Sequence, residues 1–336
     1  MEGNKKEKDR EEYKKRVNVT KKKIRKKKNA HERKIAECRK TNPKLYYAFV
    51  NQAKKTRCRI GPLLDKEKRT ITDPEQQANL LNEQYASVFT VCEEMPSAVQ
   101  MEQVDAITEE VSIDREVVLR IIGNLKENSA AGPDGIPPRV LKEIQNEIAE
   151  PLTILFRKSM DDGQIPDEWR DAVVTPIFKK GKKTDPANYR PVSLTNVTGK
   201  IMERIVKETI MNHMEGHRLI AEEQHGFRSG RSVMTNIIEF NNVTTKWLDD
   251  GKSYDVLYLD FAKAFDVVCH RRLMMKLETV GIKGKLLKWI GDWLRGRRQR
   301  VKVEGVFSEW IAVLSSVVQG LVLGGTLLVF LQIIIL

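Results

Sequence analysis

The distribution of charge along this chain of 336 residues limits which part of it can fold into a packed domain. Residues 1–60 carry 23 Lys and Arg side chains against 7 Asp and Glu, a net charge of +16, whereas residues 61–336 have a net charge of −3. The first 40 residues are polar and offer few apolar side chains for a core. We therefore expect residues 1–40 to form a solvated helix or a disordered arm, and the folded part to lie beyond them.

A segment this basic favours polyanions, because binding a phosphate backbone releases condensed counterions. Nucleic acid is the first partner to expect, and an acidic membrane surface the second. The first twenty residues contain no apolar segment, so no secretory signal is expected. The four cysteines lack CxxC or zinc-finger spacing and are expected to be free intracellular thiols. The run KKKIRKKK (21–28) could act as a nuclear address, so we expect a nuclear or cytoplasmic protein.

Hydrophobic periodicity beyond residue 40 predicts a mixture of helices and strands. Asp73 is expected to cap a helix over residues 73–89. Further helices are expected from about Asp114 and over residues 141–155, 199–214, 270–281 and 283–296. Strands are expected over residues 172–178 and 188–194, paired as a hairpin around the basic turn 179–183, and over 254–260. This interleaving indicates an α/β or α+β domain.

The last 26 residues, 311–336, contain no charged side chain. A helix of that length could cross a bilayer. Serine, glycine and glutamine residues interrupt the run, however, so we favour a buried element of the fold over a membrane anchor.

The string YLDFAKAFD (258–266) places a carboxylate, Asp260, at the end of an apolar segment, where α/β sheets often position ligand-binding side chains. A lone Asp in such a place is usually a cap or turn residue. Other motifs change that interpretation, because they surround it in a fixed order: GPDGIPPRVLKE, IPDEWRDAVVTPIFKKGKKTDPANYRPVSLTNVTGKIMERIV, EEQHGFRSGRS, WIGDWLRGRRQRV and VVQGLVLG.

These ordered motifs resemble the reverse transcriptases of non-LTR retrotransposons, the LINE-like elements of the jockey and CR1 type. The resemblance covers residues 105–330. It implies an α+β right-hand polymerase fold that copies an RNA template onto a DNA primer from deoxynucleoside triphosphates, with two Mg²⁺ ions. On this basis we expect a basic arm (1–40), a helical linker segment (41–112), a fingers-like region (113–253) and a partial palm (254–336), with the thumb absent.

The resemblance also assigns roles to single residues. Asp260 matches the first catalytic aspartate and Mg²⁺ ligand, and the backbone carbonyl of Phe261 matches its companion ligand. Phe265 matches the aromatic gate that selects deoxynucleotides, with an ordinary core Phe as the alternative. Arg190 matches a basic residue near the triphosphate or template, with a merely exposed Arg as the alternative. Asp266 is expected to fix the turn rather than bind metal.

Basic side chains beside turns and glycines are the expected contacts to nucleic acid. They are Lys179, Lys180, Arg228, Arg231, Arg297, Arg298 and Arg300. The lysines could instead only keep the hairpin soluble. His225, among the glycines of EEQHGFRSGRS, is expected to be a structural histidine on its own evidence, and Trp289 and Trp293 are expected to pack inward.

Two departures weaken the resemblance. The segment SVVQGLVLGG (316–325) keeps Gln319 and Gly320, which in the family line the nascent base pair, but differs at neighbouring positions from the family's GVPQGSVLGP. No Asp or Glu follows Glu309, so the family's aromatic-x-Asp-Asp turn has no counterpart. We expect a chain unable to polymerise. The alternatives are a non-catalytic nucleic-acid-binding remnant and, less favoured, a membrane-tail protein.

Overall fold

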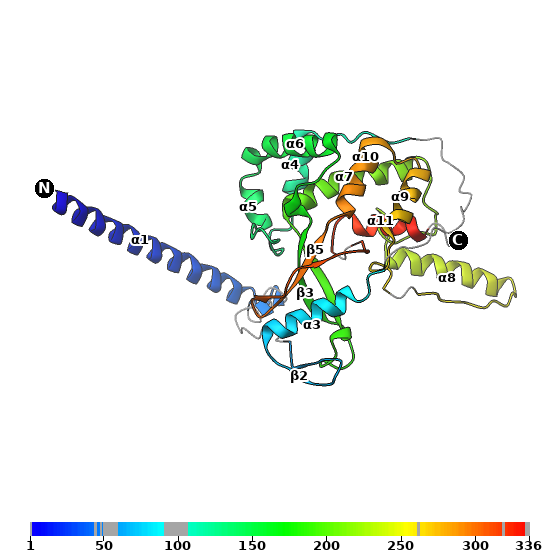
Figure 1. The fold of residues 1–336 in the computed structure, drawn as a ribbon, viewed down its shortest axis with the longest axis horizontal. Helices are drawn as coiled ribbons and strands as arrows, with labels where there is room; N and C mark the ends of the chain where they lie inside the picture. Colours follow the sequence, from blue (N-terminus) through cyan, green and yellow to red (C-terminus); the bar gives the residue numbers. More distant parts are fainter. Residues whose placement is uncertain are drawn as a thin grey trace. The chain divides into compact units, whose positions relative to one another are not determined.

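The computed structural model describes residues 2–43, 46–47, 49, 60–90, 107–260, 263–317 and 320–332. The chain divides into two compact units, Met1–Arg59 and Ile60–Leu336. The first unit contains one long helix, α1 (Glu2–Glu37), drawn in blue in Figure 1. Its lysine run is exposed to solvent. Of the two forms expected for the arm, the structure has the solvated helix.

The second unit contains a five-stranded mixed sheet. Its strands are β3 (Asp171–Phe178), β4 (Tyr189–Leu194), β5 (Arg298–Val303), β6 (Val306–Phe307) and β7 (Ile311–Ala312). β4 and β3 pair antiparallel, which confirms the predicted hairpin, and β5 runs parallel to β3. β6 and β7 both pair antiparallel with β5. A separate two-stranded ribbon is formed by β1 (Leu63–Leu64) and β2 (Thr70–Ile71).

Helices account for most of the remaining described residues. They are α3 (Pro74–Ala86), α4 (Arg115–Gly123), α5 (Pro138–Glu143), α6 (Gln145–Asp162), α7 (Val197–Gly216), α8 (Val233–Asp249), α9 (His270–Thr279), α10 (Gly284–Leu294) and α11 (Gly324–Gln332). Asp73 caps α3 by accepting a hydrogen bond from the Gln76 N–H, as predicted. The single helix predicted over 141–155 is instead two helices, because Ile144 leaves the helical conformation at φ −107° and ψ 24°.

Two apolar cores hold this unit together. The larger is built by α4, α6, α7, α9, α10 and α11, and Trp289 and Trp293 are buried in it, as predicted. The smaller lies between α3 and the sheet, where Tyr85 and Leu81 pack on Val174 and Val301. Figure 1 shows α3 running along the sheet.

The uncharged C-terminal segment contributes to the larger core. Leu327 and Phe330 of α11 are buried there, which confirms the expectation of a buried element over residues 324–330. Within the described residues, no helix combines the length and apolar character that a bilayer crossing requires.

The strand predicted over residues 254–260 is absent. This segment has no ladder partner among the described strands, and Leu257, Tyr258 and Leu259 are 82, 79 and 74% exposed. Its described ring contacts are with α8, from Tyr258 to Phe240 and from Tyr254 to Trp247. Residues with high β propensity need a neighbouring strand to complete their hydrogen bonds, and none of the described strands pairs with this segment.

The cysteines differ from the expectation of four free thiols. Cys38 is free, but Cys269 is disulfide-bonded, so the expectation is wrong at that position. Cys58 and Cys92 lie outside the described residues. Sequence spacing does not reveal which thiols a fold brings within bonding distance.

The turn in GPDGIPP is seated against the start of α7 and requires glycine. A Cβ on Gly132 would lie 2.5 Å from the Thr195 carbonyl oxygen, which is backbone and cannot rotate away. We expect Gly132→Ala to lower the free energy of unfolding by about 1–3 kcal/mol, measured by urea denaturation. Gly61→Ala is the control, because a Cβ there meets no atom within 4 Å. Equal stability of the two variants would contradict the close contact.

Candidate functional site

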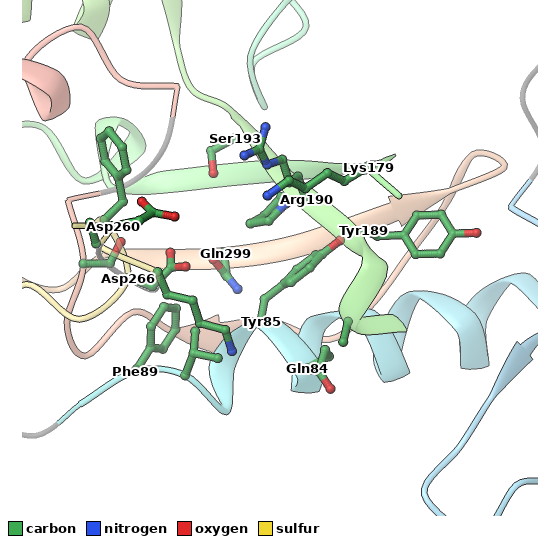
Figure 2. A pocket seen from close by; sticks show the side chains of 17 residues that line it. Gln84, Tyr85, Phe89, Lys179, Tyr189, Arg190, Ser193, Asp260, Asp266 and Gln299 are labelled. Atoms are coloured by element: carbon green, nitrogen blue, oxygen red, sulfur yellow. The ribbon is translucent and has the colours of Figure 1, made fainter. Parts of the chain in front are cut away.

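A cavity of about 570 Å³ lies where five segments of the second unit meet. The segments are residues 84–89 at the end of α3, residues 179–193 of the hairpin, Asp260 with residues 263–266, Gln299 of β5, and Ser316. Figure 2 shows the side chains that converge there. Lys179, Arg190, Asp260 and Phe265, which the family motifs had singled out, all line it. Segments more than 200 residues apart in sequence thus build one site.

The hairpin supplies two cations of the cavity, Lys179 and Arg190, and Lys263 supplies a third. Arg190 pairs with Ile177 across the two strands, and the Lys179 N–H donates to the Asn188 carbonyl at 2.9 Å, which closes the connection. The Tyr189 hydroxyl donates to the Lys183 carbonyl at 2.7 Å and fixes the basic turn. Lys179 and Arg190 are exposed, and no carboxylate of the described residues lies within ion-pair distance of either. Their charges are therefore available to an anion in the cavity.

Two carboxyl groups face the same cavity from the other side. Asp260 is exposed at the end of the unpaired segment, whereas Asp266 is partly buried. Burial raises the pKa of Asp266, and the positive charge of Lys263 opposes that shift. The Asp266 N–H donates to the Lys263 carbonyl at 2.9 Å, so the backbone of Asp266 closes a turn.

These carboxyl groups do not amount to a metal centre. Among the described residues, no group of three or more His, Cys, Asp or Glu side chains is placed to hold a metal ion. Mg²⁺ takes six oxygen ligands in nearly ideal octahedral geometry and usually retains several waters. The carboxylates brought to the cavity by residues 260–266 are too few for the two ions that the resemblance implies.

Phe265 and Gly320 both serve the fold, and of the two only Phe265 lines the cavity among the described residues. Phe265 packs edge-to-face on Phe227, with ring centroids 6.4 Å apart, while it lines the cavity. Gly320 has φ +107°, and a Cβ there would lie 2.9 Å from the Ser193 carbonyl oxygen. Both the dihedral angle and the close approach to β4 require glycine. Phe261 and Gln319 lie outside the described residues.

Glu203 of α7 was not identified from the sequence, although it fixes the segment after Gly320. Its buried carboxylate accepts hydrogen bonds from the N–H groups of Val322 and Leu323, at 2.8 and 3.3 Å, and from the Trp293 indole at 3.3 Å. Burial raises the pKa of Glu203, and the nearby Arg297 acts in the opposite direction. The available signal was an acidic residue on the apolar face of the predicted helix 199–214.

The structure corrects the prediction for Arg297. Its side chain is buried, donating to the carbonyls of Trp293 and Trp169 at 2.9 and 3.2 Å, and its guanidinium lies over the Trp293 ring. Burial lowers the pKa of Arg297 to about 10. Because its charge serves Glu203 and the core, Arg297 is not a surface contact for nucleic acid.

The other side chains predicted to contact nucleic acid differ in whether they already form ion pairs with carboxylates of the protein. Arg298 forms a two-pronged ion pair with Asp171 at 2.9 Å, and Arg231 pairs with Glu239 at 3.2 Å. Arg228 approaches Glu215 at 4.0 Å. Lys180 is exposed beside Lys179.

His225 is buried between two partners, Thr235 at 2.8 Å and Glu239 at 2.9 Å. This confirms a structural histidine. It also explains the motif EEQHGFRSGRS, because His225 and Arg231 share the Glu239 carboxylate and hold the glycine-containing turn against α8.

Residues 178–333 match the family described as reverse transcriptase (RNA-dependent DNA polymerase). The chain is 28% identical over 287 residues to a probable RNA-directed DNA polymerase from transposon X-element of Drosophila melanogaster, covering 82% of the chain and 31% of that protein. It is 30% identical over 218 residues to the RNA-directed DNA polymerase from mobile element jockey of the same species, covering 64% of the chain and 24% of that protein. The chain thus spans a third or less of the length of these relatives.

The raised pKa of Asp266 predicts a pH-dependent effect on stability. A carboxyl group whose pKa is higher in the folded state destabilises that state while it is charged, and the cost disappears as the pH falls below the raised pKa. We expect Asp266→Asn to raise the melting temperature at pH 7 by about 2 °C, with the difference shrinking towards pH 3. Asp260→Asn is the control, because Asp260 is exposed. A difference that grows on acidification would contradict this environment for Asp266.

Proposed function

We propose that the chain carries a reverse-transcriptase domain of the kind found in LINE-like, jockey-related non-LTR retrotransposons, and that its cavity receives a deoxynucleoside triphosphate next to an RNA template and DNA primer. The observation that carries this proposal is the convergence of Lys179, Arg190, Asp260 and Phe265 on one cavity. Within the proposal, residues 113–253 are the fingers-like region and residues 254–336 a partial palm.

Each cavity side chain has a chemical part in this proposal. Arg190 and Lys179, which have no carboxylate partner among the described residues, neutralise and orient the triphosphate. The Phe265 ring lies under the sugar and leaves no room for a 2′-hydroxyl. Asp260 faces the cations across the cavity, as Figure 2 shows, where a carboxylate would meet the reacting phosphate and primer hydroxyl.

The metal chemistry of such an enzyme does not fit the residues that are present. Two Mg²⁺ ions would require more carboxylates than Asp260 and Asp266, and residues 310–336 contain no Asp or Glu. We therefore propose that these 336 residues bind substrate but do not complete the catalytic centre by themselves. This restricts the proposal to nucleotide and nucleic-acid binding.

A second candidate function is nucleic-acid binding without any use of the cavity. The exposed lysines of α1 favour it, because a helix with KKKIRKKK on its surface presents a dense positive charge to a phosphate backbone. A membrane-tail protein is disfavoured, since the apolar side chains of α11 are buried in the larger core.

Nucleotide binding tests the cavity directly. We expect Arg190→Ala to weaken the binding of a deoxynucleoside triphosphate about tenfold, because one charge-assisted contact is lost. Isothermal titration calorimetry on the full chain measures it. Arg120→Ala is the matched control, because Arg120 is an exposed arginine paired with Glu208 outside the cavity. An unchanged affinity of Arg190→Ala for the nucleotide would contradict the proposal that the triphosphate binds in this cavity.

Primer extension tests catalytic competence. With an RNA template, a DNA primer, all four deoxynucleotides and Mg²⁺, the 336-residue chain is expected to make no product, because its carboxylate set is incomplete. Synthesis that disappears in Asp260→Asn would show that the centre is complete after all.

Salt dependence tests the contribution of the basic arm. Replacing Lys21, Lys22, Lys26 and Lys27 with Ala is expected to make the log–log dependence of duplex DNA binding on salt less steep by up to about 0.9 per lost phosphate contact. Fluorescence anisotropy at several salt concentrations measures the slope. The control replaces four ion-paired lysines of the second unit with Ala, so that both variants have the same net charge. These lysines are Lys142, Lys158, Lys252 and Lys285. Equal slopes for both variants would exclude a special role for the arm.

A further inference from the structure

β5 carries two chemically different faces. Gln299, Val301 and Val303 point toward α3, where the two valines join the smaller core and Gln299 lines the cavity. Because side chains alternate along a strand, Arg298, Arg300 and Lys302 lie on the opposite face. These three cations are spaced about 6.6 Å apart along the strand. They form a positive row that does not belong to the cavity.

Two aromatic rings are interleaved with this row. The Arg300 guanidinium carbon lies 3.9 Å from the centre of the Phe307 ring and 4.5 Å from that of Trp310. Arg298 lies 5.1 Å from the Trp310 ring, and the Lys302 amine lies 4.9 Å from the Phe307 ring. Both rings remain partly exposed. We call these five residues the β5 strip.

The cations of the strip differ in whether their charge is already matched. Arg298 is paired with Asp171. Within the part of the chain that the structure describes, no carboxylate lies within ion-pair distance of Arg300 or Lys302. The Arg300 Nε is buried and has no hydrogen-bond partner there. Arg300 is therefore a guanidinium held between two rings, with its charge unmatched.

We propose that the β5 strip binds single-stranded nucleic acid at a site separate from the nucleotide cavity. A row of cations along one strand matches a polyanion that runs parallel to it, and a fixed guanidinium plane is suited to two-pronged contact with a phosphate. The rings and the guanidinium plane offer stacking surfaces to unpaired bases, which a duplex would not expose. The proposal extends the function proposed above but does not depend on nucleotide binding in the cavity.

Photochemical cross-linking tests this site. A 12-nucleotide single strand with one 5-iodouracil, made as both DNA and RNA, is irradiated with the full chain, and cross-linked peptides are identified by mass spectrometry. We expect cross-links at Phe307 or Trp310. Lys302→Ala, which removes an exposed side chain, and Arg300→Ala are each expected to reduce the yield at these residues about tenfold, while Arg300→Lys gives an intermediate yield.

Matched controls separate this site from the arm and the cavity. Arg120→Ala and Arg190→Ala are expected to leave cross-linking at Phe307 and Trp310 within twofold of the wild type. If the chain did not bind the nucleotide but still formed cross-links at the strip, the proposal for the cavity would be contradicted and the proposal for the strip would stand. Cross-links confined to residues 1–59, or an unchanged yield in both Lys302→Ala and Arg300→Ala, would overturn the strip proposal. Competition by polyglutamate as effective as that by the oligonucleotide would assign the strip to acidic polymers instead.

Discussion

The parallel pairing of β3 with β5 is the interaction on which the site depends. It joins Val174 to Val301, more than 120 residues away in the sequence, and brings the hairpin of β3 and β4 beside the strand that carries Gln299. α3 packs on the face that this pairing creates, and its end supplies another wall of the cavity. Without the β3–β5 ladder, the cations of the hairpin and the residues around Asp260 would belong to separate pieces of chain.

Two buried ionisable residues hold the other end of the same region. Glu203 and Arg297 are both buried, and each has hydrogen bonds to backbone or indole groups. Burying a charged group costs free energy unless hydrogen bonds compensate for the lost hydration. Glu203 ties α7 to Trp293 and to the segment that follows Gly320, whereas Arg297 ties the residues before β5 to Trp169 and Trp293. Gly320 in turn lies close to the backbone of β4, at the Ser193 carbonyl. Main-chain packing therefore joins the segment held by Glu203 to the hairpin that lines the cavity.

Features set by local sequence were predictable, and features set by distant partners were not. The Asp73 cap, the hairpin and the amphipathic helices each depend on residues within a few positions of one another. The prediction of a strand over 254–260 is wrong because a strand needs a hydrogen-bonded neighbour, and no described strand pairs with this segment. The prediction for Arg297 is wrong because a run of basic residues usually lies at the surface. This one side chain, just before β5, instead points inward, where it bonds to the carbonyls of Trp293 and Trp169. The motifs singled out Asp260, Arg190, Phe265 and Lys179 for different roles, and the structure brings all four to one cavity, which no local rule predicts.

The unpaired segment and the incomplete carboxylate set lead to the same conclusion about chemistry. A catalytic carboxylate must be held to within roughly 0.5 Å, which neighbouring strands and packed side chains normally ensure. Asp260 ends a segment with no ladder bonds among the described strands, and its neighbours Leu259 and Tyr258 are mostly exposed. The backbone of Arg190, in contrast, lies in the registered hairpin of β3 and β4. In the function proposed above, the cavity would therefore bind a triphosphate more readily than it would catalyse its reaction, so binding and catalysis need to be measured separately.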